Sequence, residues 1–131
     1  MDLIFDIEAD NLLDDVTSVW CIVGRDKDTE KVYTFEPHEI EQGLVFLSKA
    51  DTLIGHNIID YDLRVLKKLY DFDYTGKVID TLVYSRTIWC DVREIDITLS
   101  KKNNFPQKLM GSHSLKAWGY RLGELKGEFN V

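Results

Sequence analysis

The chain has 131 residues, of which 44% are hydrophobic and 30% are charged. This length suffices for one domain with one buried core and is too short for two. The 11% share of aromatic residues excludes a disordered tail. The formal net charge of −7 argues, taken alone, against a nucleic-acid partner.

The distribution of charge is more informative than its sum. Residues 101–131 carry six basic and two acidic side chains, whereas residues 1–100 carry ten basic and twenty-one acidic ones. An acidic region that gathers Mg²⁺ beside a basic segment suits a metal-dependent nuclease. Ordinary solvated surface produces the same distribution, so charge leaves both interpretations open.

Neither the cysteines nor the N-terminus indicates secretion. Cys21 and Cys90 lie in apolar settings without a C-x-x-C pair, which predicts reduced core residues of a cytosolic protein. The opening MDLIFDIEAD has acids where a signal peptide needs positive charge, and no apolar run approaches a membrane span. We expect a cytoplasmic protein without a membrane partner.

Periodicity and turn residues predict the elements in chain order. Strands are expected over residues 2–8, 19–24, 32–35, 52–55 and 77–79. Helices are expected over residues 37–49, 60–70 and 80–89, and from Ser112 or Ser114 to near Gly123, with Leu115, Trp118 and Leu122 inward. Residues 91–110 show weak periodicity and are interpreted as a long surface loop. This order predicts an α/β domain with a mixed five-stranded sheet flanked by helices, in the ribonuclease H-like arrangement.

The sharpest local feature is Asp6-Ile7-Glu8, inside the first predicted strand. Residues two apart on a strand point to the same side, so both carboxylates project into one space. Two anions that close repel each other unless cations neutralise them, and divalent metal is the usual remedy. Exposed strand acids produce the same short pattern, but the apolar residues on either side favour a metal site.

A second polar group, residues 56–62 (HNIIDYD), directly follows the strand predicted over residues 52–55. It offers further carboxylates at the C-terminal end of a strand, where ligands bind in open α/β sheets. A helix N-terminus that favours acids in its first turn explains the same residues without chemistry. Together with the two acids of the first strand, the group favours one pocket in which three carboxylates converge.

Four phrases extend this pattern over nearly the whole chain, in order and at sensible spacing. They are FDIEADNLL at 5–13, HNIIDYDLRVL at 56–66, IDTLVYSR at 79–86 and GSHSLKAWGYRLGELKGEF at 111–129. The sequence resembles the N-terminal 3′→5′ exonuclease (proofreading) domain of family A DNA polymerases from short-tailed bacteriophages.

The resemblance implies a ribonuclease H-like fold and a DEDD-type exonuclease that uses two Mg²⁺ or Mn²⁺ ions to shorten a single-stranded DNA 3′ end. Its motifs imply that the metal ligands and catalytic residues are Asp6, Glu8 and Asp62, and that the substrate-binding residues are His56, Asn57 and Tyr61. The catalytic acid of the second motif matches Asp62 rather than Asp60, because it follows the tyrosine of H-N-x-x-x-Y-D. Asp80 is expected to cap a helix.

The family pattern continues with a Tyr-x-x-x-Asp motif that supplies the fourth metal carboxylate. No such motif is found up to Val131. Tyr120 and Glu124 have the same spacing, but they lie within the phrase GYRLGE, which the family has in addition to its last motif, so we do not assign them this role. We therefore expect residues 1–131 to be a single partial domain that lacks the last family helices, a fragment or split gene product completed in trans by the remaining polymerase polypeptide. The alternative is a catalytically weak or inactive module that binds nucleic acid or completes a polymerase.

Overall fold

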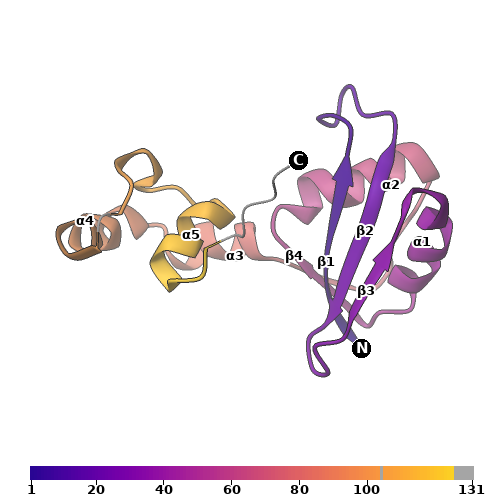
Figure 1. The fold of residues 1–131 in the computed structure, drawn as a ribbon, viewed down its shortest axis with the longest axis horizontal. Coiled ribbons are helices and arrows are strands. Elements are labelled where there is room, and N and C mark those ends of the chain that lie inside the picture. Colours follow the sequence, from indigo (N-terminus) through magenta and orange to yellow (C-terminus); the bar gives the residue numbers. More distant parts are fainter. Residues whose placement is uncertain (104, 126–131) are drawn as a thin grey trace. The chain divides into compact units, whose positions relative to one another are not determined.

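The computed structural model describes residues 1–103 and 105–125. The chain divides into two compact units, unit 1 (Met1–Thr81) and unit 2 (Leu82–Val131) (Figure 1). In the described part of the chain, no helix is long and apolar enough to cross a membrane.

Unit 1 is built on a mixed sheet of five strands, each within a few residues of its predicted position. The strands are β1 (Asp2–Ala9), β2 (Val19–Asp26), β3 (Val32–Phe35), β4 (Thr52–Gly55) and β5 (Lys77–Asp80). Their order is β3-β2-β1-β4-β5, with β2 antiparallel to both of its neighbours and β4 parallel to both of its own. This topology confirms the predicted ribonuclease H-like α/β sheet.

The helical segments of unit 1 follow β3 and β4. They are a 3₁₀ turn (Pro37–Glu39), α1 (Ile40–Ser48), a π-helical turn (Ile58–Asp62) and α2 (Leu63–Tyr70). Both predicted helices are therefore present, each preceded by a turn of different winding. Pro at the first position begins the 3₁₀ turn as expected, because its fixed φ suits a helix start.

The two helices of unit 1 share one hydrophobic core with one face of the sheet. Leu3, Phe5 and Ile7 alternate along β1 and are at most 5% exposed, as the period of two predicts. They belong to one buried cluster whose other members include Ile22, Leu44, Leu47, Leu53, Ile58, Val65 and Leu66. Because members from both α1 and α2 join this single cluster, the two helices pack on the same face.

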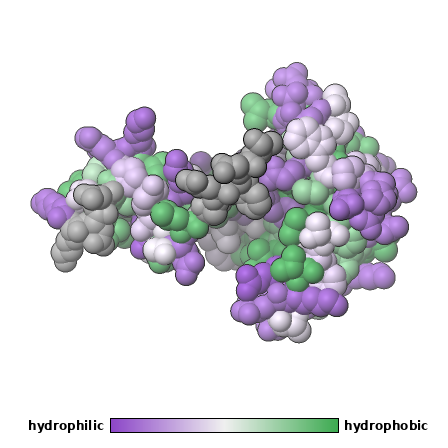
Figure 2. Space-filling model, viewed as in Figure 1, coloured by the Kyte–Doolittle hydropathy of each residue, from purple (hydrophilic) through white to green (hydrophobic). Residues whose placement is uncertain are grey.

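The opposite face of the sheet carries the alternate side chains. Strand pairing places Val32, Arg25, Ile4, Ile54 and Ile79 in one row across all five strands. Within this row Val32 is 56% and Ile4 42% exposed. Figure 2 shows hydrophobic surface over the strands between hydrophilic ends. Asp6 and Glu8 lie on this same face of β1, beyond the row.

Unit 2 contains the remaining helices, of which one was not predicted. They are α3 (Thr81–Ile88, beginning at the last residue of unit 1), α4 (Val92–Asn103), a 3₁₀ turn (Gln107–Leu109) and α5 (Leu115–Leu122). The predicted loop over residues 91–110 was wrong, because most of it is α4. Val92 and Asp96 are the buried positions of α4, one turn apart. A buried aspartate reads as a solvent-facing residue in a sequence, and it masked the helical period.

Helix α5 has the predicted ends but a different buried face. The Ser114 hydroxyl accepts from the Ala117 amide at 3.1 Å, and Gly123 ends the helix with φ of 73°. Leu115 and Leu122 are 60% and 70% exposed, so their predicted inward orientation was wrong. Ala117 is fully buried instead, on a face shared with Arg121.

A buried ion pair explains that face. Asp96 is fully buried, and its two oxygens accept from Nε and Nη2 of Arg121, both at 2.7 Å. Asp96 also accepts from the Gly111 amide at 2.8 Å, and Arg121 also donates to the Ser112 carbonyl at 2.6 Å. The guanidinium carbon lies 4.8 Å from the centre of the Trp118 ring. Residues from three segments of unit 2, namely α4, the loop before α5 and α5 itself, therefore meet at one charged centre.

The cysteines differ in environment. Both are free thiols, as predicted, but only Cys21 is partly buried and Cys90 is exposed. The prediction of a core position for Cys90 was wrong.

Candidate metal centre

Two of the predicted site residues lie side by side on the outer face of β1. Asp6 and Glu8 alternate with the buried Phe5 and Ile7. In the pairing with β2, Asp6 lies opposite Val23 and Glu8 opposite Cys21. Both carboxylates therefore leave the sheet on the same side, at the carboxyl half of β1.

Asp62 reaches this region from the turn that follows β4, the strand on the other side of β1. Parallel pairing between β1 and β4 ends at Ile4 and Ile54, although β1 continues to Ala9. Beyond that point the Ile7 amide donates to Oδ2 of Asp62 at 3.1 Å. The Asp62 carboxylate thus continues the hydrogen bonding of β1 past the end of β4. This is the carboxyl end of the parallel strands, where open α/β sheets bind ligands.

A π-helical turn presents Asp62 to β1. The turn spans Ile58–Asp62 and follows Asn57, which has a left-handed φ of 61°. Asp62 is 4% exposed, whereas Asp60 on the same turn is exposed. π-helical turns are rare and frequent at functional sites. The sequence offered no signal for this winding. The family resemblance nevertheless selected Asp62 over Asp60, because Asp62 follows Tyr61.

Like charges set the electrostatics of the site. The pKa of Asp62 is raised to about 7, first by burial and then by the negative charge of Asp6. Burial also raises the pKa of Tyr61, as do the charges of Asp62, Asp10, Glu8 and Asp6. The negative charges of these acids therefore all act on the region around Tyr61 and Asp62. Two carboxyl groups this close hold a proton between them unless a cation takes its place.

The three carboxylates do not yet form a closed ligand set. Among the described residues, the trio whose ligand atoms all lie within 4.8 Å of one another is Glu36, His38 and Glu39. That trio surrounds the start of the 3₁₀ turn, where the two glutamates form a capping box. It therefore has a structural explanation. Asp6, Glu8 and Asp62 fall outside this limit, as expected for anions that repel one another without a cation.

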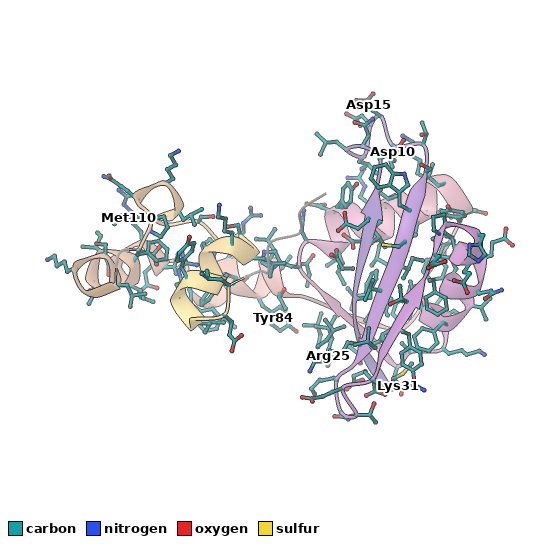
Figure 3. The ribbon with its side chains drawn as sticks, in the orientation of Figure 1. Asp10, Asp15, Arg25, Lys31, Tyr84 and Met110 are labelled. Atoms are coloured by element: carbon teal, nitrogen blue, oxygen red, sulfur yellow. The ribbon has the colours of Figure 1, made fainter. Side chains whose placement is uncertain are left out.

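The predicted substrate-binding residues make structural contacts around the acids. The Tyr61 hydroxyl donates to the Asn11 carbonyl at 2.6 Å and so anchors the loop that follows β1. His56 Nδ1 lies 2.9 Å from the Thr81 hydroxyl. His56 Nε2 is buried and has no hydrogen-bond partner among the described residues. In Figure 3, Asp10 and Asp15 mark the end of the sheet at which this loop lies, opposite Arg25 and Lys31.

The carboxylate of Asp80 holds the start of the π-helical turn through hydrogen bonds to backbone amides. It is 2% exposed and accepts from the amides of Asn57 at 2.9 Å and Ile59 at 3.0 Å. Strand pairing explains its position, because Asp80 lies beside Gly55 at the ends of β5 and β4. Asp80 therefore holds the turn that carries Asp62, a role that sequence reasoning missed, while the predicted capping of the helix after β5 stays a prediction.

Replacing Asp80 with alanine is expected to lower the free energy of unfolding of the chain by about 2 kcal/mol, because two buried amides lose their acceptor. Urea unfolding followed by circular dichroism measures the loss. Asp80→Asn keeps one acceptor oxygen and should lose less. Asp28→Ala, at an exposed hairpin position, is the control and should stay within about 0.5 kcal/mol. Equal stability of Asp80→Ala and Asp28→Ala would contradict this role.

The basic C-terminal segment contributes fewer free charges than its sequence indicates. Arg121 is buried in its ion pair, and Phe105 is 6% exposed rather than presented to solvent. Lys101, Lys108 and Lys116 are exposed. The side chain of Lys102 and all of Lys126 lie outside the described residues.

Comparisons with known proteins extend these observations. No family model matches the sequence. The chain is 36% identical over 138 aligned positions to the DNA-directed DNA polymerase of Enterobacteria phage T3, and 36% identical over 138 positions to that of Escherichia phage T7. Each alignment covers 97% of this chain and 20% of the polymerase. A solved family B DNA polymerase from the hyperthermophilic archaeon Pyrobaculum calidifontis aligns with 63% of the chain and 13% of its own length, at 21% identity and a TM-score of 0.44.

The sequence relationship covers nearly the whole chain, but the chain spans only about one fifth of the length of the phage polymerases. The alignments therefore cover nearly all of the sequence that carried the resemblance, and the predicted resemblance to these phage polymerases is confirmed. Over nearly its whole length, the chain is related to a segment of the DNA polymerases of phages T3 and T7.

Proposed function

We propose that this chain is the 3′→5′ exonuclease segment of a phage-type DNA polymerase and removes nucleotides from single-stranded DNA 3′ ends with Mg²⁺ or Mn²⁺. The observation that carries the proposal is that the buried carboxyl group of Asp62 lies beside that of Asp6. A buried carboxyl with a pKa of about 7 beside a second carboxyl lowers the stability of the folded chain when it is ionised. Groups with such perturbed pKa values are concentrated at functional sites. The relationship to phage DNA polymerases supports DNA as the substrate.

The residues present fit a divalent metal centre. Carboxylate oxygens are the ligands that Mg²⁺ and Mn²⁺ prefer, and a cation would relieve the repulsion that raises the Asp62 pKa. Asp6 and Asp62 would hold the first ion, with Glu8 beside them for a second. Two such ions supply an activated water and stabilise the leaving oxygen in phosphodiester hydrolysis.

The remaining residues orient this centre. The Ile7 amide fixes one oxygen of Asp62, which leaves the other free to face Asp6. Tyr61 ties the loop after β1 to the π-helical turn and so fixes the rim of the site. Asp62 must lose its proton when a cation binds, so binding should strengthen as pH rises toward 8.

A second candidate function is a catalytically weak or silent module that binds DNA or completes a polymerase supplied in trans. It is favoured by the incomplete ligand set: the site offers three acids, and their oxygens do not converge within 4.8 Å. Calorimetric titration with Mn²⁺ discriminates the two functions. Binding of two ions by the chain alone supports the enzyme, and binding of one or none supports the module.

The direct test incubates purified chain with 5′-labelled single-stranded DNA and Mn²⁺ and resolves the products by length. The chain should shorten the DNA from its 3′ end, and Asp6→Ala should be at least about a hundredfold slower, because it removes a metal ligand. Asp60→Ala, on the exposed side of the π-helical turn, is the matched control and should retain activity. Equal degradation by Asp6→Ala would assign the activity to a contaminant and sink the proposal.

A further inference from the structure

Unit 1 contains a second concave feature, apart from the acid cluster formed by Asp6, Glu8 and Asp62. A pocket of about 510 Å³ lies beside α2, between this helix, the segment that follows it and the loop after β1. This volume falls within the roughly 300–1,000 Å³ of small-molecule sites. Every lining residue belongs to unit 1.

The charge of this pocket is opposite to that of its surroundings. Unit 1 has eighteen acidic and eight basic side chains, a net charge of −10. Three of those eight basic residues, Arg64, Lys67 and Lys68, line the pocket. Basic residues are therefore concentrated at this one place in an otherwise acidic unit, and this favours an anionic ligand.

Two of the three cations keep their charge available. Lys67 donates to Asp71 and Asp73, each at 2.8 Å, so its charge is neutralised. Lys68 donates instead to the carbonyls of Leu13 at 2.7 Å and Asp14 at 3.0 Å, which carry no net charge. In the described parts of the chain, no carboxylate lies within ion-pair distance of Arg64 or Lys68.

The acids of the pocket do not cancel these charges. Asp73 is already paired with Lys67. Asp14 lines the pocket as well, so one acidic side chain stands against the two cations Arg64 and Lys68. The free charge of the pocket is therefore positive.

The rest of the wall is apolar and held in place. Phe72 and Tyr74 line it together with Leu13 and Leu63. Both aromatic residues are partly exposed, so their surfaces are accessible. The Tyr74 hydroxyl donates to the Ala50 carbonyl at 2.7 Å, which orients the ring. A flat apolar wall beside free cations suits a ligand that has both an aromatic part and an anionic part.

We propose that this pocket binds a nucleotide, with its phosphate at Arg64 and Lys68 and its base against Phe72 and Tyr74. Arginine forms paired hydrogen bonds to phosphate, and aromatic side chains stack on every base. This goes beyond the proposed nuclease activity, because binding here requires neither a metal ion nor cleavage.

The nucleotide can be free or part of a strand. Leu63 of the pocket directly follows Asp62 of the acid cluster. The loop after β1 contributes to both places, since Asn11 contacts Tyr61 while Leu13 and Asp14 contact Lys68. The two places therefore share the loop after β1 and the junction between the π-helical turn and α2.

The test measures binding in EDTA, so that it does not depend on metal or cleavage. Isotope-labelled chain is titrated with deoxyadenosine 5′-monophosphate, with a short oligothymidylate and with inorganic phosphate, and amide signals are followed by NMR. The mononucleotide and the oligonucleotide should shift the signals of Leu63, Phe72 and Asp73 saturably. Arg64→Ala/Lys68→Ala should weaken both by at least about tenfold. Lys27→Ala/Lys31→Ala, which removes two exposed charges between β2 and β3, should leave both unchanged; Lys31 is labelled in Figure 3.

Each outcome decides the proposal. Tighter binding of the oligonucleotide identifies a strand as the source, and equal binding identifies a free nucleotide; either supports the site. Inorganic phosphate that binds as tightly as the mononucleotide, or variants that bind like the parent chain, would overturn it. Lys68→Ala also removes hydrogen bonds to the loop, so Arg64→Ala alone, which breaks no hydrogen bond or ion pair of the described residues, must show the same direction. Asp6→Ala should abolish cleavage but not this binding, so the two proposals fail separately.

Discussion

Replacing Asp96 with alanine is expected to lower the free energy of unfolding of unit 2 by about 3–5 kcal/mol, because it leaves the Arg121 guanidinium buried without a counter-charge. Arg121 is 3% exposed. Its Nη1 is already buried without a hydrogen-bond partner in the described structure, so little remains to compensate the charge once Asp96 is absent.

The protonation of Asp96 defines the pH range of this effect. Burial alone would raise the pKa of Asp96, but the hydrogen bonds from Arg121 and Gly111 and the charge of Arg121 lower it below its ordinary value of 3.8. A lowered pKa in the folded state means that the stability is present above pH 3.8 and is lost as pH falls through the folded-state pKa. The measurement therefore belongs at neutral pH.

Tryptophan fluorescence in a Trp20→Phe background measures the loss, because the remaining Trp89 and Trp118 both lie in unit 2 and pack against each other at 5.1 Å. Glu94→Ala, at an exposed position of α4, should stay within about 0.5 kcal/mol. The double variant Asp96→Leu/Arg121→Met should recover most of the stability, since apolar replacement of a buried pair is often neutral or better. A small loss in Asp96→Ala would show that the pair is solvated.

Local patterns in the sequence were sufficient for most of the fold. Alternation along β1 predicted that Leu3, Phe5 and Ile7 are buried, because a strand with one covered face has a period of two. Ser114 and Gly123 predicted the ends of α5, because capping depends only on neighbouring backbone groups. Such signals need no knowledge of the tertiary structure.

Features that depend on distant partners were not predictable in the same way. The burial of Asp96 depends on Arg121, twenty-five residues away, and without it α4 reads as a loop. The π-helical turn depends on Asp80, which holds amides more than twenty residues earlier in the chain. In both cases a buried aspartate organises the structure, and a sequence pattern treats such residues as surface.

The site shows the same division. Strand geometry predicted that Asp6 and Glu8 share one side, and the resemblance selected Asp62 over Asp60. Neither could predict that the Ile7 amide binds Asp62, or that Asp62 is buried enough to change its protonation. Those properties arise only because β1 continues past the end of β4.

The altered protonation of Asp62 makes the stability of the metal-free chain depend on pH. Its pKa rises from 3.8 in the unfolded chain to about 7 in the folded one, so the folded state binds the proton more tightly. The stability from this group is then fully present below pH 3.8 and is lost as pH rises through about 7. The whole difference corresponds to about 4 kcal/mol, of which about 3 kcal/mol is lost between pH 5 and 8.

Asp62→Asn should remove this dependence, because an amide does not ionise and can still accept from the Ile7 amide. In EDTA we expect this variant to be more stable than the parent chain by about 4 kcal/mol at pH 8, and by only about 1–2 kcal/mol at pH 5, where the folded parent keeps its proton but the unfolded parent has lost it. Urea unfolding at both pH values measures the difference, and Asp60→Asn, on the exposed side of the same turn, should follow the parent.

Adding divalent metal tests whether the stability lost on ionisation of Asp62 serves metal binding or has only a structural origin. If Asp62 is kept for metal binding, Mn²⁺ should stabilise the parent chain at pH 8 by RT ln(1 + [Mn²⁺]/Kd) and should have little effect on Asp62→Asn. Parallel pH profiles of the parent and Asp62→Asn would show that Asp62 is ionised without penalty. The repulsion between Asp6 and Asp62, on which the proposed metal centre depends, would then be absent.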